Sequence, residues 1–405
     1  MSEASDARRP VVAAGDVERW DAEVDVVVVG AGGSALTAAV MAAEAGASVL
    51  VLEKAAEIGG TTAKSGGGVW VPLNRHMKAL GIPDSREGAL RYMARTSRPA
   101  LYSPGASHMG LPEWEYEGLC LFVDEGATAF ASLEDIGALA MAPVPDFPNY
   151  YTAVPEDVHK RGRGMSPVDD DGVPADGTEM IRQLSEALFR RGGSIRVEHR
   201  AVGAVVDGDR VVGVVARTPA GAAAFHAARG VVFGSGGFTH DPELRRAYLQ
   251  GPVFGGCAAI TNEGDFVPIA QELGAEMRNM TEAWCVPVIL ERALARDPDL
   301  HGTFNIVGDS MLCVNRHGRR VMNEKLLYNE TGGPMRAFDA AHSEYPNMLL
   351  FAIFDQACLE RFRGSVFDGG LMPMPGDDDR HVLHADTLAG LGAAIDARLA
   401  EIEHE

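Results

Sequence analysis

The first strongly apolar stretch of the chain covers residues 24–52, and its pattern changes twice. Residues 26–29 form an unbroken run of valines, which is typical of a strand buried on both faces of a parallel sheet. A helix-favouring stretch follows as far as Ala45, and residues 48–52 return to a strand-like run. The pattern therefore predicts a β-α-β unit.

Later segments continue this alternation of strands and helices. Helices are predicted at residues 86–96, 113–134, 178–191 and 386–403, the last with Asp386 as its N-cap. Strands are predicted at residues 194–198, 202–206, 210–216 and 231–233, with a hairpin turn at Asp207 and Gly208. The alternation predicts an α/β fold class, and the pattern changes to a mixed α+β segment after about residue 287.

The turn after the first strand reads G-A-G-G-S-A and fits the dinucleotide-binding pattern G-x-G-x-x-A. Gly30 would permit the tight turn, and Gly32 would let the backbone approach a pyrophosphate. Ala35 stands where the pattern often has a third glycine and still permits close packing of helix and strand. Glu53 ends the second strand, where an acid accepts hydrogen bonds from a ribose diol. Together these features predict dinucleotide binding.

The composition of the chain excludes some classes of binding partner. The formal net charge of -21 argues against binding to nucleic acid or to an anionic membrane surface. No apolar run of about 20 residues is free of a glycine cluster or a charge, so we expect no stable membrane insertion. Residues 1–23 are charged and lack an apolar signal core, which predicts a flexible lead-in and a cytoplasmic protein. The scattered cysteines and histidines predict neither a disulfide framework nor a metal site.

Several motifs stand in a characteristic order. They are the fingerprint at residues 28–33, L-E-K at 52–54 with G-G-T at 59–61, V-F-G-S-G-G-F at 232–238, E-G-D at 263–265 and V-N-R-H-G-R-R-V-M-N-E at 314–324. In these motifs the chain resembles the flavoprotein family of soluble fumarate reductases and 3-ketosteroid dehydrogenases. The resemblance implies a Rossmann-like FAD-binding domain at residues 24–288 and an α+β cap domain, which binds substrate, at residues 289–405. It implies non-covalent FAD, because residues 59–68 contain no histidine for a covalent link.

The same resemblance implies which residues hold FAD. The set combines the first fingerprint, the glycine-rich segment at 59–68, a backbone contact to adenine and the second glycine turn. Its members are Gly30, Gly32, Gly33, Ala35, Glu53, Lys54, Gly60, Thr61, Thr62, Ser65, Gly66, Gly67, Ala201, Gly236, Gly237 and Asp265.

Three positions distinguish the branches of the family. Fumarate reductases carry a His-Pro-Thr motif where residues 284–287 read W-C-V-P, and a Glu-x-x-Arg relay that residues 305–310 lack. They also carry an arginine where this chain has Tyr328. The positions resemble the ketosteroid branch instead, which implies Tyr328 as catalytic base and Tyr151 as the second catalytic tyrosine. Tyr150 competes with Tyr151 for that role, and Arg320 and Glu324 are expected to brace the loop.

We therefore expect an FAD-dependent oxidoreductase acting on CH–CH groups, which α,β-desaturates a 3-ketosteroid or similar apolar ketone and passes electrons to an acceptor. One alternative is a fumarate-reductase-like enoate reductase, in which an arginine such as Arg336 would face the flavin. The family's glycine-rich return to the FAD domain is not found before Glu405. Either the sequence is a fragment of a longer chain, or, as a second alternative, the protein is a truncated, non-catalytic flavoprotein remnant.

Overall fold

The structure is a computed structural model that describes residues 10–295, 309–326, 328–364 and 371–402. Contacts divide the chain into two compact units. Unit 1 comprises Met1–Asp241 and Thr261–Arg278, and unit 2 comprises Pro242–Ile260 and Asn279–Glu405. The boundary at residue 288 between an FAD-binding and a cap domain stays a prediction.

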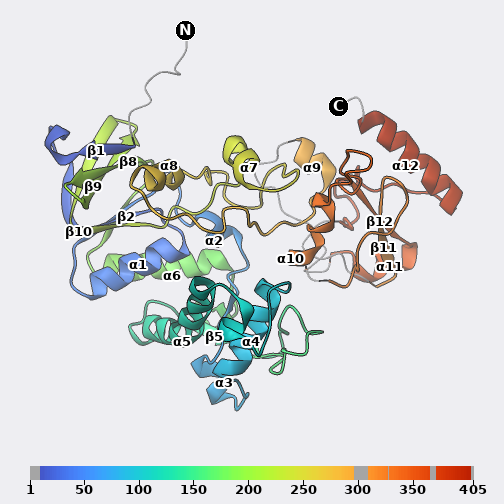
Figure 1. Ribbon diagram of the computed structural model, residues 1–405, viewed down its shortest axis with the longest axis horizontal. Helices are drawn as coiled ribbons and strands as arrows, with labels where there is room; N and C mark the ends of the chain where they lie inside the picture. The colour runs from blue at the N-terminus through green and yellow to red at the C-terminus, as the bar shows by residue number, and fades with distance from the viewer. Residues whose placement is uncertain (1–9, 296–308, 327, 365–370, 403–405) are drawn as a thin grey trace, which may run out of the picture. The chain divides into compact units, whose positions relative to one another are not determined.

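Unit 1 is built on a seven-stranded sheet with the order β1-β8-β9-β10-β2-β3-β7 (Figure 1). Its strands are β1 (Val11–Ala13), β2 (Ala22–Val29), β3 (Val49–Leu52), β7 (Ser194–Arg196), β8 (Arg200–Asp207), β9 (Arg210–Thr218) and β10 (Gly221–Phe233). Strands β10, β2, β3 and β7 are parallel, whereas β8, β9 and β10 pair as antiparallel neighbours. The predicted β-α-β unit and the hairpin at Asp207 and Gly208 are confirmed.

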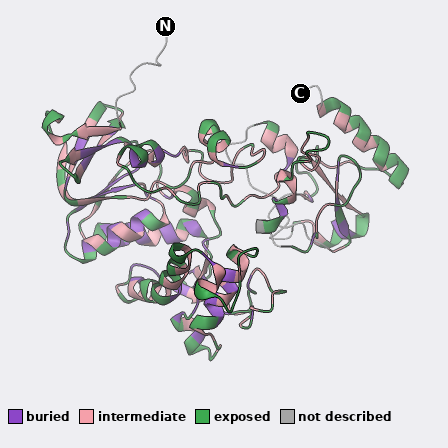
Figure 2. Cartoon of the chain, viewed as in Figure 1, coloured by how far each residue is buried: buried purple, intermediate pink, exposed green. Residues whose placement is uncertain are grey.

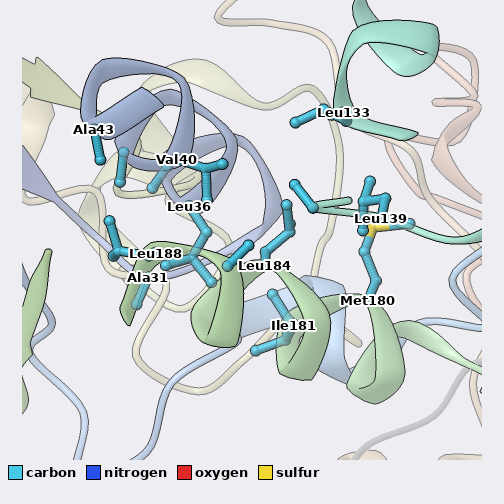
Figure 3. Packing of buried hydrophobic residues seen from close by; sticks show 14 of the residues in the cluster. Ala31, Leu36, Val40, Ala43, Leu133, Leu139, Met180, Ile181, Leu184 and Leu188 are labelled. Carbon is cyan, nitrogen blue, oxygen red and sulfur yellow. The ribbon is translucent and has the colours of Figure 1, made fainter. Parts of the chain in front are cut away.

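Two helices pack on one face of this sheet, α1 (Gly33–Glu44) and α6 (Gly177–Arg190). Leu36 and Val40 of α1 meet Leu184 and Leu188 of α6 in the main hydrophobic core, and all four are fully or almost fully buried (Figure 3). Figure 2 shows the buried stripe on both helices and the exposed residues on their other faces. Burying a side chain of this size stabilises the fold by about 1.5–3 kcal/mol. This core fixes the strand ends at which the glycine turns lie.

A smaller antiparallel sheet completes unit 1, with the order β4-β6-β5. Its strands are β4 (Val69–Trp70), β5 (Met141–Pro143) and β6 (Gly164–Pro167). The remaining helices of unit 1 are α2 (Gly60–Lys64), α3 (Arg75–Ala79), α4 (Arg86–Ser97), α5 (Glu113–Asp135) and α8 (Phe266–Glu272), with 3-10 turns η1 (Ala14–Asp16) and η2 (Ser107–Gly110). Met165 of β6 and Leu133 of α5 join the main core, so the small sheet is anchored to α1 and α6.

Unit 2 is a mixed α+β segment around the antiparallel pair β11 (Met311–Asn315) and β12 (Leu350–Phe354). Its helices are α7 (Pro242–Tyr248), α9 (Leu290–Leu294), α10 (Tyr328–Thr331), α11 (Gln356–Phe362) and α12 (Leu388–Ile402), with the 3-10 turn η3 (Pro334–Arg336). The predicted N-cap of the last helix, Asp386, is wrong. Thr387 takes that position, because its Oγ1 accepts a hydrogen bond of 3.1 Å from the amide of Gly390.

No helix within the described parts of the chain is long and apolar enough to cross a membrane. The predicted α/β class with a second α+β part is confirmed by this architecture.

Candidate cofactor and active site

Two glycine turns meet at the carboxyl ends of the central parallel strands. Gly30 follows β2 with a φ of +97°, and a Cβ on it would lie 2.6 Å from the carbonyl oxygen of Gly234. Gly234 follows β10, and a Cβ there would lie 2.6 Å from the Cβ of Ala35. Larger side chains would therefore force the turns and helix α1 apart. The three small residues keep open a cleft at the strand ends, where α/β sheets bind nucleotides.

Helix α1 presents its N-terminus to this cleft. Its N-cap is Gly32, which has no side chain with which to cap the helix. The amide of Gly33 donates to Oγ1 of Thr62 across 3.1 Å, so α2 lies beside the first turn of α1. Free amides and the positive end of the helix dipole favour a phosphate here. The arrangement fits the pyrophosphate of a dinucleotide.

Glu53 lies at the end of β3 and is only 8% exposed. One of its carboxylate oxygens accepts from the amide of Ala31 (2.8 Å), and the other accepts from the amide of Ala55 (2.9 Å). Each carboxylate oxygen carries a further lone pair, so the group retains acceptor capacity for a ribose diol. Glu53 thus links the first turn to β3 and still borders the cleft.

A charge network closes one side of the cleft. Lys54 Nζ lies 2.9 Å from Oδ2 of Asp265 and 3.1 Å from Oε2 of Glu263. Arg200 Nη2 reaches the same two carboxylates, at 2.5 Å from Asp265 and 3.0 Å from Glu263. Because two cations face two anions, the network ties the loop before α8 to the ends of β3 and β8 with little net charge. The resemblance named Lys54 and Asp265 but missed the role of Arg200.

Most of the predicted cofactor residues line one cleft. Those that border it are Gly30, Gly32, Gly33, Glu53, Lys54, Gly60, Thr61, Thr62, Ala201, Gly236 and Asp265. The structure also places His199 and Asn262 at its wall, which sequence reasoning did not single out. Asn262 Nδ2 donates to Oγ1 of Thr61 across 3.1 Å, so it connects the loop before α8 to α2.

The other predicted cofactor residues lie around the cleft but do not line it. Ala35 is fully buried behind the turn. Ser65 closes α2, where its Oγ donates to the carbonyl of Thr62 across 2.7 Å, and exposed Gly66 follows it. Gly67 is buried, and a Cβ on it would lie 2.6 Å from the backbone of Asp176. Gly237 accepts from the amide of Gly264 across 3.0 Å. Their contact with the cofactor stays a prediction.

Tyr151 lies in an aromatic cluster within unit 1. Its ring contacts that of Tyr92 edge-on, with centroids 6.5 Å apart, and its amide donates to the Tyr92 hydroxyl across 3.0 Å. Trp70 lies just after the glycine segment. The centroid of its ring lies 5.8 Å from that of Tyr92, and its ring stacks on Phe122 with centroids 6.3 Å apart. Tyr150 packs on Phe147 instead, with centroids 6.2 Å apart. Which of the two tyrosines faces a substrate stays open.

Tyr328, the predicted base, begins α10, and its side chain lies outside the described residues. Glu324 is 2% exposed, and its Oε1 accepts from the amide of Cys313 (2.8 Å) and from Nε of Arg320 (3.0 Å). The hydrogen bonds from Arg320 hold the pKa of Glu324 below its usual value. Arg320 and Glu324 thus brace β11, and their expected role in bracing the active-site loop stays a prediction.

Within the described residues, no group of three or more His, Cys, Asp and Glu side chains could hold a metal ion. The glycine turns, the open helix N-terminus and the acid at the end of β3 define a Rossmann-like dinucleotide-binding protein. Its particular family follows from comparison with known proteins. The chain belongs to the FAD binding domain family, whose sequence profile matches residues 25–372. Its cofactor is therefore FAD.

Two known proteins illustrate this membership, and one solved structure has a similar fold. The chain is 32% identical to 4-oxocyclohexanecarboxylate 2-dehydrogenase of Sinomonas cyclohexanicum, over 84% of this chain and 65% of that protein. It is 26% identical to 3-oxosteroid 1-dehydrogenase of Mycolicibacterium smegmatis, over 91% of this chain and 74% of that protein. Its fold matches 3-ketosteroid delta1-dehydrogenase from Sterolibacterium denitrificans in complex with 1,4-androstadiene-3,17-dione, with a TM-score of 0.78 at 24% identity, over 94% of this chain and 78% of that one. The chain thus spans just under two thirds of the first relative's length.

Proposed function

We propose that the protein is an FAD-dependent oxidoreductase that introduces a carbon–carbon double bond next to the carbonyl of an apolar cyclic ketone. Two of the relatives are named for the dehydrogenation of cyclic ketones, a 4-oxocyclohexanecarboxylate and a 3-oxosteroid. A 3-ketosteroid or a smaller ring ketone is the proposed substrate class.

The observation that carries the proposal is the aromatic cluster at Tyr151. It combines a phenol with the apolar faces of Trp70, Tyr92 and Phe122. It begins with the residues that directly follow the glycine segment predicted to run along the flavin. An apolar wall that carries phenols suits a ring ketone better than a small dicarboxylate, which needs a clamp of cations.

The proposed reaction removes a proton and a hydride from adjacent carbons, and the electron pair of the C–H bond next to the carbonyl forms the double bond. FAD, when bound, takes up the hydride. A tyrosinate takes up the proton, and we propose Tyr328 as that base. Because the ordinary pKa of a phenol is about 10, this base needs a hydrogen-bonding partner that stabilises its anion. We propose Tyr151 as the second catalytic tyrosine.

An anaerobic absorbance titration tests the proposal. The purified protein is mixed separately with 4-androstene-3,17-dione and with 4-oxocyclohexanecarboxylate, and the visible band of oxidised flavin is followed. Bleaching by either ketone supports desaturation and identifies the size of the ring system. Tyr151→Phe should slow the bleaching, whereas Tyr116→Phe on α5, which lies outside the aromatic cluster, serves as the matched control. A bound flavin that neither ketone bleaches refutes the proposal.

A second candidate is reduction of an enoate. It is favoured by Arg336 in η3, whose Nε is buried and has no hydrogen-bond partner among the described residues. An arginine in that state is suited to a carboxylate. Reoxidation of chemically reduced enzyme by fumarate or another enoate, together with no response to ketones, would support it. A colourless protein without turnover would support the non-catalytic remnant.

A further inference from the structure

Tyr92 makes a direct polar contact with the backbone of Tyr151. It lies on α4 and is 5% exposed. Its hydroxyl oxygen accepts the hydrogen bond from the amide of Tyr151, and the two rings meet edge-on at an interplanar angle of 60°. A single side chain therefore fixes both the backbone and the ring of the tyrosine that the family resemblance places at the substrate.

Tyr92 is held in turn by a buried cation. The guanidinium carbon of Arg163 lies 5.8 Å from the centroid of Tyr92 and 5.1 Å from that of Trp70. Arg163 is 1% exposed and makes two hydrogen bonds to Asp84, of 3.0 Å from Nε and 2.7 Å from Nη2. A bidentate buried pair has one geometry, so the ring that rests on it has little freedom.

The loop that carries Tyr151 is tied down on both sides. Asn149 Oδ1 accepts from the indole nitrogen of Trp70 across 2.8 Å. Its Nδ2 donates to Oδ1 of Asp157 (2.6 Å) and to the carbonyl of His159 (2.7 Å). These contacts fix Asn149 and the segment at 157–159, and the bond from Tyr92 holds the amide of Tyr151 between them.

Tyr92 is not suited to be the base itself. Burial raises its pKa above the usual value for tyrosine, and the charge of Asp157 acts in the same direction. Its hydroxyl therefore stays protonated at neutral pH. What it offers is a fixed acceptor oxygen for the amide of Tyr151.

We infer that Tyr92 is a positioning residue for the reaction, which sets where the phenol of Tyr151 lies. The effect on catalysis rests on the proposed function. The positioning of Tyr151 by Tyr92 does not depend on that function. The aromatic cluster then does more than fill the interior. The cation–aromatic stack of Arg163 and Tyr92 is a rigid support for the loop that carries Tyr151.

The test compares Tyr92→Phe with Tyr116→Phe as the matched control. Tyr116 is a partly buried tyrosine on α5 whose ring stacks on that of His108 rather than on a ring of the aromatic cluster. Tyr92→Phe keeps the ring and removes only the hydroxyl. Both variants should therefore fold and bind FAD, with Tyr92→Phe melting somewhat below the wild type because the amide of Tyr151 loses its acceptor. In Tyr92→Phe, kcat should fall about tenfold to 100-fold, because small misplacements of reacting groups are costly. KM should stay within about twofold, since the apolar contacts remain.

Amide hydrogen exchange gives a readout that needs no turnover. A peptide that covers residues 149–153 should exchange about fivefold faster in Tyr92→Phe and be unchanged in Tyr116→Phe. Unchanged exchange and unchanged kcat overturn the inference, as does a rise in KM at constant kcat. If the wild type acts on no ketone, the proposed function fails, and the exchange experiment alone decides whether Tyr92 positions the loop.

Discussion

Replacing Arg163 with methionine is expected to destabilise unit 1 by about 3–5 kcal/mol, the usual cost of breaking a buried ion pair from one side. The side chains of Arg163 and Asp84 are 1% and 3% exposed. Methionine fills much of the space but leaves the carboxylate without its cation. Asp84 keeps the amides of Leu73 (3.0 Å) and Ser85 (2.8 Å) as donors, which places the expected loss near the lower end of that range.

The loss of stability in Arg163→Met should depend on pH in a defined direction. Burial is the largest single influence on the pKa of Asp84 and raises it. The hydrogen bonds and charge of Arg163, together with the amides of Leu73 and Ser85, outweigh burial and hold the pKa below its usual value. In the wild type the stabilisation is therefore present above the unfolded pKa of about 4 and is lost as the pH falls through the lower folded pKa. Without Arg163, burial is opposed only by the amides of Leu73 and Ser85, so the pKa of Asp84 is higher than in the wild type. The variant therefore gains less stability than the wild type as the pH rises through that window, so the difference between the two is largest at neutral pH.

Urea unfolding followed by circular dichroism at several pH values measures both effects. Arg86→Met is the matched control, since Arg86 makes the same kind of pair with Asp124 but in solvent, with side-chain exposures of 50% and 40%. It should change the free energy of unfolding little. The double variant Arg163→Met with Asp84→Leu should recover much of the lost stability, because no buried charge is then left alone. A loss below about 1 kcal/mol for Arg163→Met at neutral pH, or one that does not shrink in acid, would refute the reasoning.

Two further predictions concern the cleft and unit 2. Gly234→Ala should lower the free energy of unfolding by about 1–3 kcal/mol through overpacking, because the new Cβ would lie 2.6 Å from that of Ala35. The ratio of flavin to protein absorbance should also fall. Glu324→Ala should cost about 1–3 kcal/mol at neutral pH, since it leaves the buried amide of Cys313 without its acceptor. Because Arg320 lowers the pKa of Glu324, thermal unfolding should show the difference from wild type shrinking as the pH falls through the folded pKa.

Each of these predictions has an outcome that would contradict it. Gly230→Ala is the control for Gly234→Ala, because a Cβ at Gly230 meets nothing within 4 Å. Equal flavin content in the two variants would show that the close approach of the turns is unimportant. For Glu324→Ala, a melting temperature equal to that of wild type at neutral pH would show that the carboxylate does not hold β11.

Local patterns predicted those elements whose two faces differ sharply in polarity. Helix α6 was predicted at residues 178–191 and is observed at Gly177–Arg190, with the Asp176 side chain accepting from the amide of Thr178 as its cap. Strand β10 was predicted only at residues 231–233, yet it begins at Gly221. Its first half is rich in alanine and has weak β propensity, so it is a strand because it pairs with β9.

The residues of the candidate site also divide into those that local patterns could predict and those that they could not. Glu53 could be predicted because the acid follows its strand at the spacing that a ribose requires. Arg200 could not, since only the order of the strands brings it to Asp265 and Lys54. Likewise, no spacing along the chain indicates that the hydroxyl of Tyr92 meets the amide of Tyr151. Contacts between distant segments follow from the topology, which periodicity alone does not determine.

The meeting of the two glycine turns has a consequence for biosynthesis. Val29 pairs with Phe233, and the first turn is complete only when Gly234 lies against Gly30. At elongation rates of about 5–20 residues per second, the ribosome needs about 10–40 s to make the intervening chain. During this interval the valine-rich β2 has no β10 beside it, and its edge is exposed to pairing with other chains. The nascent protein would gain its nucleotide cleft late, and a chaperone that shields this strand would favour correct assembly.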